Sequence, residues 1–318
     1  MDTGKRAPVG PRFEIARGAQ GYPEAFELIP DPPERLYIVG DAQAVTEGIA
    51  VVGARNATPY GRNATKLFAG RAAELGVAVI SGGARGCDSC AHEAALEAGG
   101  KTVAFLGGGV DVPYPASNAP LFQRIVDGGG AVASEYPWGS PPRPFRFRAR
   151  NRLIAGLARA TLIVEAGLPS GTFSTADEAL AANKEVLAVP GSIFSPTSAG
   201  SNALIAQGAM PVASIEGLDA LLMRIFPDIV GGAHGAEQLM MDFGGAEVGA
   251  GASIDDPIVA ALAADPMRFE QIVAQFAADD ADPLAAASRL MAHLSLLEGA
   301  GAIARFPDGR FGVVGDVA

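Results

Sequence analysis

The amino-acid sequence predicts an α/β fold: a doubly wound, mostly parallel sheet followed by a small domain with the outline of a winged helix. One observation is that short β-branched and apolar runs alternate with helical patterns over residues 22–226. Another is that several of these runs end in glycines directly before a helical pattern. Because strands buried on both faces read as continuous apolar runs, this alternation is typical of a parallel sheet covered by helices on both sides.

The strands and helices of the sheet domain follow one another in regular order. We expect strands at residues 36–40, 49–53, 77–81, 102–106, 131–134, 161–165, 186–189 and 211–214. We expect helices near residues 61–75, 87–98, 119–127, 151–158, 175–183, 202–207 and 218–225. The proline-rich stretch at residues 141–144 is expected to form a turn before the fourth helix.

Composition divides the chain into four parts. Residues 1–21 are polar and are expected to form a disordered or extended lead-in, and residues 22–226 form the sheet domain. Residues 227–253 shift to glycine, alanine and methionine without periodicity, as in a linker. Residues 254–318 hold three helical patterns and two short apolar runs around an Asp-Gly turn, which predicts a hairpin. The helices of this winged-helix-like domain carry more acidic than basic residues, so we expect it to contact protein rather than duplex DNA.

Size, charge and cysteine content limit the class of protein. Of the 318 residues, 49% are hydrophobic, which is enough to bury a substantial core. No apolar run reaches the roughly 20 residues that span a membrane, and no signal peptide is visible. The two cysteines, Cys87 and Cys90, cannot form a disulfide framework. We therefore expect a cytoplasmic protein without membrane contact. The net charge of −11 argues against a generally basic surface, yet the arginines are unevenly placed.

The first candidate site is the loop after the predicted strand at residues 49–53. Gly53 and Arg55 follow the apolar run, and a helical pattern begins after Tyr60. In an open α/β sheet this arrangement brings backbone N–H groups and a cation to the carboxyl edge of a strand, where anions bind. The loop lacks the Gly-x-Gly-x-x-Gly fingerprint, and the next strand does not end in the acidic residue that a dinucleotide site needs. No Walker sequence is present either, so no nucleotide cofactor is expected.

A second loop repeats this arrangement of strand, glycines, arginine and helix. The run Ser81-Gly82-Gly83-Ala84-Arg85-Gly86 precedes the helix expected at residues 87–98. Adjacent parallel strands would place this loop beside the Arg55 loop and pool their amides and guanidinium groups. The alternative is that these glycines only allow the strand and helix to pack closely. A third loop, Ser170-Gly171-Thr172, adds hydroxyl groups and amides at a further strand end.

Arginines concentrate in one short segment. With no acidic residue among them, six lie within the segment 143–159: Arg143, Arg146, Arg148, Arg150, Arg152 and Arg159. Phe145 and Phe147 are interleaved with them. Guanidinium groups beside aromatic rings suit single-stranded nucleic acid, where cations hold phosphates and rings stack on bases. The alternative is a solvated helix face whose arginines pair with acidic neighbours.

Taken together, these motifs resemble the DprA/Smf family of DNA-processing proteins over about residues 22–222. The resemblance is carried by residues 52–56 with Pro59-Tyr60-Gly61, by 81–86 with Asp88 and His92, by 107–111 with Tyr114-Pro115 and Asn118, by 134–137, by Phe147 with 150–157, by 164–166 with 170–172, by 189–192 and by 200–205. Many members have a longer N-terminal helical domain than the lead-in can supply, and many also carry a C-terminal winged helix.

The resemblance implies an extended Rossmann-like core that binds single-stranded DNA, protects incoming DNA, forms a homodimer and helps load RecA in natural transformation. It implies no catalytic activity, no metal and no other cofactor. With the loops described above, the residues expected to bind DNA or phosphate are Gly53, Arg55, Ser81, Gly82, Gly83, Arg85, Gly86, Arg146, Phe147, Arg150, Asn151, Arg152, Ser170, Gly171 and Thr172.

One alternative is an enzyme. The chain also shares glycine loops with nucleotide phosphoribohydrolases of the LOG, or lysine-decarboxylase-like, type. That family places a catalytic glutamate three residues after a Gly-Thr pair. Here Gly171-Thr172 is followed at that spacing by Thr175, while Asp177 and Glu178 are displaced. The DNA-binding interpretation therefore fits the sequence better.

Overall fold

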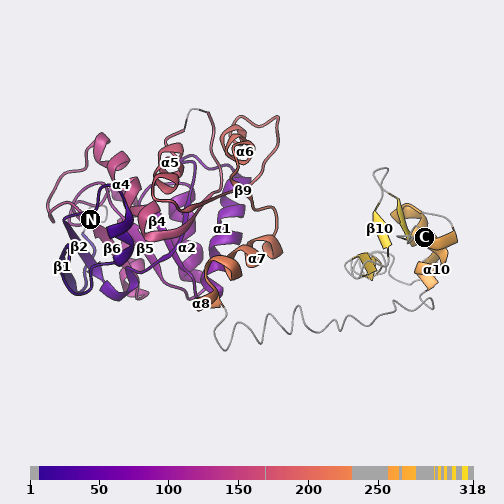
Figure 1. Cartoon of the computed structure of the whole chain (residues 1–318), viewed down its shortest axis with the longest axis horizontal. Coiled ribbons are helices and arrows are strands. Elements are labelled where there is room, and N and C mark those ends of the chain that lie inside the picture. The colour runs from indigo at the N-terminus through magenta and orange to yellow at the C-terminus, as the bar shows by residue number, and fades with distance from the viewer. Residues whose placement is uncertain are drawn as a thin grey trace. The chain divides into compact units, whose positions relative to one another are not determined.

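The computed structural model describes residues 7–168, 170–230, 257–264, 267–276, 290, 293–294, 297–298, 303–305 and 310–313. The chain divides into two compact units, Met1–Gln238 and Leu239–Ala318. The first unit holds a nine-stranded sheet and the second a two-stranded sheet (Figure 1). In the described part of the chain, no helix is long and apolar enough to cross a membrane.

The large sheet has the strand order β1-β2-β6-β5-β4-β3-β7-β8-β9. Its strands are β1 (Arg12–Ala16), β2 (Arg35–Gly40), β3 (Gly48–Val52), β4 (Ala78–Gly82), β5 (Thr102–Phe105), β6 (Ala131–Ser134), β7 (Ala158–Ile163), β8 (Glu185–Ala188) and β9 (Met210–Pro211). All pairings from β6 across to β9 are parallel, whereas β1 and β2 pair antiparallel at one edge. The predicted mostly parallel sheet is confirmed.

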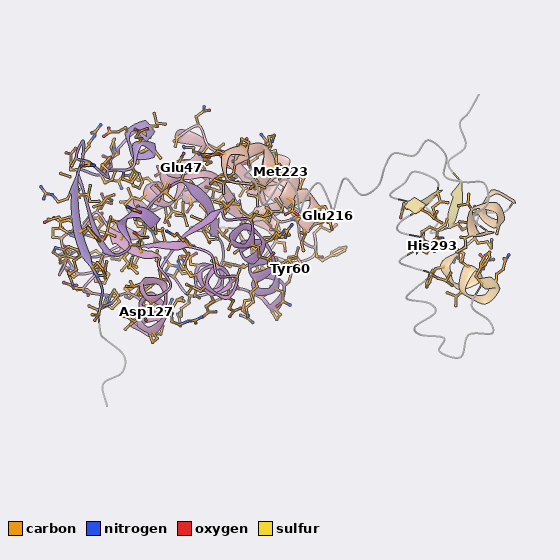
Figure 2. The ribbon with its side chains drawn as sticks, turned by 90° about the horizontal axis from the view of Figure 1, so that it is seen from below. Glu47, Tyr60, Asp127, Glu216, Met223 and His293 are labelled. Carbon is orange, nitrogen blue, oxygen red and sulfur yellow. The ribbon has the colours of Figure 1, made fainter. Side chains whose placement is uncertain are left out.

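Helices cover both faces of this sheet (Figure 1), as the view turned by 90° also shows (Figure 2). They are α1 (Pro59–Glu74), α2 (Cys87–Glu97), α3 (Ala119–Asp127), α4 (Pro144–Leu157), α5 (Phe173–Ala181), α6 (Ala199–Ala206), α7 (Ile215–Ile225) and α8 (Pro227–Val230), with short turns η1 (Glu24–Leu28), η2 (Ala42–Ala44) and η3 (Ala116–Asn118). Successive side chains of a strand point to opposite faces. In β5, Phe105 joins the core that contains α4, whereas Ala104 joins the core that contains α3. The sheet is therefore doubly wound.

The chain reverses its direction of travel across the sheet between β3 and β7, which lie side by side. From β3 the chain adds β4, β5 and β6 on one side, and from β7 it adds β8 and β9 on the other. In open α/β sheets, ligands bind outside the carboxyl ends of the strands at such a switch point. The loop that carries Arg55 follows β3, so the topology places it at this crevice.

The N-terminal lead-in contains a strand that the sequence analysis did not predict. Residues 12–16 form β1, which pairs with β2 from Arg12 opposite Val39 to Ala16 opposite Arg35. The side chains of β1 are exposed or half-buried, so no apolar run marks this strand in the sequence. Backbone pairing holds it, together with an ion pair of 2.8 Å between Arg12 and Asp111.

Two predicted boundaries are wrong. Helix α4 begins at Pro144, within the stretch that the sequence predicts as a turn. Proline is tolerated at the first helical position because its missing N–H would be unpaired there. The predicted linker 227–253 also begins too early, since residues 227–230 form α8 and Val230 is buried with its N–H donating to the Phe226 carbonyl. Residues 231–253 lie outside the described residues.

The second unit contains α10 (Pro257–Ala264), α11 (Phe269–Phe276) and the antiparallel strands β10 (Ile303–Arg305) and β11 (Phe311–Val313). Its small core consists of Ile258, Leu262, Ile272, Leu294, Ile303 and Phe311. These elements match two of the three predicted helices and both predicted hairpin strands. The hairpin turn and most of the third helix, residues 284–299, lie outside the described residues, so the winged-helix outline stays a prediction.

Candidate functional site

A cavity of about 580 Å³ opens at the carboxyl ends of β3 and β7. Segments far apart in the sequence line it: the loop after β3, the start of α2, one face of α4 and the loop that leads into α5. Eight of the fifteen predicted site residues lie on its wall, namely Gly53, Arg55, Phe147, Arg150, Asn151, Ser170, Gly171 and Thr172. The topology therefore brings three of the predicted segments to one place.

The rim of the cavity combines a cation with an aromatic ring. Arg55 is exposed, and its guanidinium carbon lies 6.0 Å from the centre of the Phe147 ring. The ring packs against Gly107, where a Cβ would lie 2.7 Å from Phe147 Cδ1, so only a glycine admits it there. On its other side, the Phe147 ring meets Tyr114 with centroids 5.2 Å apart. Phe147 is thus held in place beside Arg55.

Arg150 forms the floor of the cavity. It is only 5% exposed, and its Nη1 donates a hydrogen bond to the Phe105 carbonyl. A Cβ on Gly82 would lie 2.5 Å from both Arg150 Nη1 and Asp88 Oδ2, so the missing side chain of Gly82 makes room for this charge pair. Burial lowers the pKa of Arg150 to about 10, and the negative charge of Asp88 opposes that shift. Arg150 therefore remains a cation at neutral pH.

Asp88 is the counter-charge on the cavity wall. It is 6% exposed and its Oδ2 accepts a hydrogen bond of 3.2 Å from the Ala84 N–H. Burial raises the pKa of Asp88, whereas the charge of Arg150 lowers it. Asp88 belongs to one of the motifs shared with the DprA/Smf family but is not among the residues predicted to bind DNA. Its place at the first turn of α2, directly after the glycine loop, was the available signal.

The opposite wall presents hydroxyl groups and amides. Ser170 Oγ lies 3.0 Å from Thr172 Oγ1 and accepts a hydrogen bond of 3.2 Å from the Thr172 N–H. The Asn151 side chain donates a hydrogen bond of 2.7 Å to Ser174 Oγ and thereby joins α4 to α5. Arg148 and Asp177, which the sequence analysis did not select, also line the cavity. This wall can donate hydrogen bonds to an anion as well as accept them from a base or sugar.

Most of the second glycine loop supports the cavity from behind. Ser81 is buried and its hydroxyl donates to the Val51 carbonyl at 2.6 Å. Gly86 has a φ of +83°, and a Cβ there would overlap the Ala54 carbonyl oxygen. Gly83 and the exposed Arg85 line a smaller pocket of about 70 Å³ on the far side of Phe147. Ser81, Gly82 and Gly86 are thus closely packed and line neither pocket.

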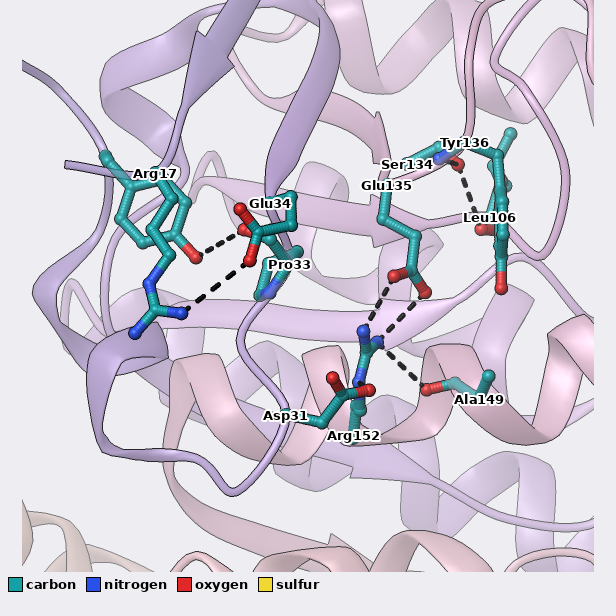
Figure 3. Close-up of polar contacts among 11 residues, drawn as sticks. Arg17, Asp31, Pro33, Glu34, Leu106, Ser134, Glu135, Tyr136, Ala149 and Arg152 are labelled. Atoms are coloured by element: carbon teal, nitrogen blue, oxygen red, sulfur yellow. Dashed lines mark hydrogen bonds and ion pairs between the residues drawn. The ribbon is translucent and has the colours of Figure 1, made fainter. Parts of the chain in front are cut away.

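The last two predicted residues, Arg146 and Arg152, lie outside both pockets. Arg152 is clamped by two carboxylates, with Nη2 2.7 Å from Glu135 Oε2 and Nε 2.8 Å from Asp31 Oδ2 (Figure 3). Arg146 stacks over the Tyr136 ring at 4.2 Å. Residues that are two positions apart on an α-helix differ by about 200° of rotation about its axis, so Arg152 cannot face the same way as Arg150. Arg152 therefore pairs with acidic neighbours, which is the alternative to DNA binding that the sequence left open.

The remaining polar groups near the site are structural. His92 is fully buried, and its Nε2 donates to the Gly82 carbonyl at 2.7 Å, because a carbonyl can only accept. Burial lowers the pKa of His92 to about 4. Cys87 and Cys90 are buried free thiols, and burial raises the pKa of Cys87 to about 12. Within the described ranges, no three His, Cys, Asp or Glu side chains gather in a way that could hold a metal.

The chain is similar in sequence to known proteins. The family model for DNA recombination-mediator protein A matches residues 14–222. The chain is 47% identical over 180 residues to a putative DNA processing protein DprA of Mycobacterium tuberculosis, covering 56% of this chain and 46% of that protein. It is 40% identical over 203 residues to protein Smf of Escherichia coli, covering 64% of this chain and 54% of that protein. The chain thus spans about half the length of these relatives.

Two solved structures have a similar fold. DNA processing protein A of Streptococcus pneumoniae gives a TM-score of 0.62 at 36% identity, over 66% of this chain and 74% of that one. DNA processing protein A of Helicobacter pylori, in a structure described by its single-stranded DNA binding mode, gives a TM-score of 0.62 at 31% identity. That alignment covers 69% of this chain and 99% of the other.

Proposed function

Because the chain belongs to the DNA recombination-mediator protein A family, we propose that it binds single-stranded DNA in the cavity at the carboxyl ends of β3 and β7. In this proposal it acts in the cytoplasm, protects incoming DNA and helps load RecA during recombination and natural transformation. The observation that carries the proposal is the state of the arginines. Those on the cavity wall are free of close ion pairs, whereas many of those elsewhere are paired.

The ion pairs of the first unit make this contrast plain. The paired arginines are Arg12, Arg17, Arg35, Arg71, Arg152, Arg159 and Arg224, and none of them lines the cavity. Arg55 and Arg148 line it and form no ion pair within 4.0 Å of any described carboxylate. In a protein of net charge −11, unpaired arginines around one cavity create a local anion site. Phosphates of a DNA strand are the anions that such a site fits.

Stacking groups favour a single strand over a duplex. Phe147 and Phe173 line the cavity between the cations and the hydroxyl groups. An aromatic side chain can stack on a base only where that base is unpaired and accessible. A duplex keeps its bases inside, so it could offer this cavity phosphates alone.

The test is equilibrium binding of labelled oligo-dT over a range of salt concentrations. We expect the logarithm of the affinity to fall linearly with the logarithm of the salt concentration, and the affinity for duplex DNA to be weaker. Arg55→Ala should weaken binding by about 1–3 kcal/mol and reduce the salt slope by about one. The matched control is Arg124→Ala, because Arg124 lines neither pocket and its loss should leave the affinity unchanged. Equal affinity of the wild type and Arg55→Ala would overturn the site assignment.

We propose that the site binds without catalysis. The position at which LOG-type phosphoribohydrolases carry a catalytic glutamate holds Thr175, which is 3% exposed. A threonine hydroxyl cannot replace a carboxylate as a general acid near neutral pH. Incubation with nucleoside 5′-monophosphates should therefore release no free base, as chromatography would show. Measurable base release that is lost in Asp177→Asn would favour the enzyme instead.

We further propose that the protein forms a homodimer through the β8–β9 side of the sheet. No charged residue occurs between Glu185 and Glu216. Within that stretch Ile193 and Phe194 are 84% and 89% exposed, which is unusual for large apolar side chains. Depletion of charge with exposed aromatic residues is typical of protein interfaces. Light scattering should give a dimer mass for the wild type and a smaller mass for Phe194→Glu, and an unchanged mass would place the interface elsewhere.

A further inference from the structure

A buried carboxylate lies directly behind the Arg55 loop. Glu165 follows β7 and is 1% exposed. Its Oε2 accepts a hydrogen bond of 2.8 Å from the Thr58 N–H, and its Oε1 accepts one of 2.7 Å from the Thr58 hydroxyl. Both bonds reach across more than a hundred residues of sequence to Thr58, which caps the N-terminus of α1. The cavity itself does not include Glu165.

This carboxylate occupies the N-terminus of α1. A Cβ on Gly61 would overlap Glu165 Oε2, so the carboxylate fits against the first turn of α1 only because residue 61 is a glycine. Pro59 has no N–H to offer, and the Gly61 N–H donates to Thr58 Oγ1 at 3.1 Å. A helix N-terminus after the first strand of such a sheet is the usual place for a ligand phosphate. Here the carboxylate of Glu165 takes the place of a ligand phosphate, and few N–H groups at this end of α1 remain to bind a second anion.

The same carboxylate fixes one end of the loop that carries Arg55. At the other end, Gly53 packs so closely on α2 that a Cβ would lie 2.6 Å from Cys87 Sγ. In the middle, Gly86 lies against the Ala54 and Arg55 carbonyls, and the Cys87 N–H donates to the Ala54 carbonyl at 3.1 Å. The loop backbone is therefore held at three points. The exposed Arg55 side chain lies over the Phe147 ring.

We propose that Glu165 is a positioning residue: it keeps phosphate away from α1 and holds the Gly53–Thr58 loop so that Arg55 faces the cavity. This inference rests on the proposed function of that cavity. It also predicts the sign of an electrostatic effect. If Glu165 acted only through its charge, removing that charge would strengthen binding of an anion. As a positioning residue, it must weaken binding when it is changed.

A double-mutant cycle with Arg55 tests this. We expect Glu165→Gln, which keeps the size of the side chain, to weaken oligo-dT binding about fivefold, and Arg55→Ala to weaken it about tenfold, within the range for one lost phosphate contact. The double variant should bind within about twofold of Arg55→Ala alone, because both changes remove the same contact. Glu165→Gln should also reduce the salt slope by about one, as Arg55→Ala does.

Two further variants keep the test decisive. Asp219→Asn removes another buried carboxylate, which lies on α7 and pairs with Arg71 on α1. This variant should lower stability without changing the oligo-dT affinity or the salt slope. Thr58→Val removes one of the two donors to Glu165 and should cause a smaller loss of oligo-dT affinity than Glu165→Gln. It replaces Glu165→Gln in the test if that variant does not fold. An additive double variant, or tighter binding by Glu165→Gln, would overturn the positioning role. Failure of the wild type to bind oligo-dT would instead overturn the proposed function itself.

Discussion

The two faces of α4 use neighbouring arginines for different purposes. Arg150 faces the cavity, where its positive charge is balanced by Asp88 but remains within reach of a ligand. Arg152 faces away and is clamped by Glu135 and Asp31 (Figure 3). No acidic residue occurs in the segment 143–159 around them, so local composition alone does not distinguish them. The difference teaches that what an arginine contributes depends on whether a carboxylate pairs with it directly, as Glu135 and Asp31 do with Arg152.

The largest expected effect concerns Arg152. Its side chain is 11% exposed and that of Glu135 is 14% exposed, so this is a largely buried ion pair. Arg152→Ala leaves Glu135 without its partner and should lower the free energy of unfolding by about 3 kcal/mol, as denaturant titration would measure. Arg17→Ala, which breaks an exposed pair with Glu27, should lower the free energy of unfolding far less, because solvent screens that pair. If Arg152→Ala weakens DNA binding while stability is unchanged, the assignment of the two faces is wrong.

The second effect is a loss of stability in acid that originates from His92. Its pKa is about 4 in the folded protein and about 6.5 when unfolded, so the fold prefers the neutral ring. This contribution is complete above about pH 6.5 and is lost as the pH falls toward 4, at most about 3 kcal/mol. Asp88, whose pKa is raised, acts in the opposite direction in acid. His92→Gln should flatten the pH dependence of unfolding between pH 6.5 and 4; an unchanged curve would show that His92 is not its source.

The third effect tests the floor of the cavity. Arg150→Lys keeps the charge beside Asp88 but replaces the planar fork by a single ammonium group. We expect oligo-dT affinity to fall by about 2 kcal/mol, because a single ammonium group cannot keep the hydrogen bond to the Phe105 carbonyl and contact a phosphate together. Arg152→Lys is the matched control on the other face and should leave affinity unchanged. Comparable losses of affinity in both variants would erase the contrast between the faces.

The smallest effect separates stacking from charge. Phe147→Leu should weaken oligo-dT binding by about 1 kcal/mol, at the lower end for a lost stacking contact. The salt slope should stay the same, since no cation is removed. Phe145→Leu provides the comparison, because Phe145 is 63% exposed on the same helix but does not line the cavity. A change in salt slope with unchanged affinity would contradict a stacking role for Phe147.

The sheet could be predicted because each central strand is short, apolar and followed by a recognisable loop. The strand β1 could not, since Arg12 to Ala16 shows no apolar run and depends on pairing with a distant strand. The start of α4 was also missed, because the prolines at residues 141–144 are equally compatible with a turn and with a helix start. Local sequence patterns do not contain these long-range pairings.

The site was predictable as a set of segments but not as a set of side chains. The segments containing Arg55, Phe147 and Ser170 do meet at one cavity. Arg152 could not be separated from Arg150, because its partners Glu135 and Asp31 lie 17 and 121 residues away in the chain. Glu165 belongs to the motif at residues 164–166, but the sequence assigns it no role. Its importance appears only when β7 is placed beside β3.

The absent side chain of Gly82 has a consequence for how a strand would be captured. Because Arg150 is buried in that space and hydrogen-bonded to the Phe105 carbonyl, its long side chain loses its conformational freedom when the protein folds rather than when a ligand arrives. Immobilising such a side chain costs about 0.5–1.5 kcal/mol in an association. Arg55 and Arg148, which are exposed, still bear that entropic cost on binding. The floor of the cavity is thus preorganised and the rim is adaptable, so under the proposed function the floor would favour tight retention of a strand while the rim would accommodate different sequences of bases.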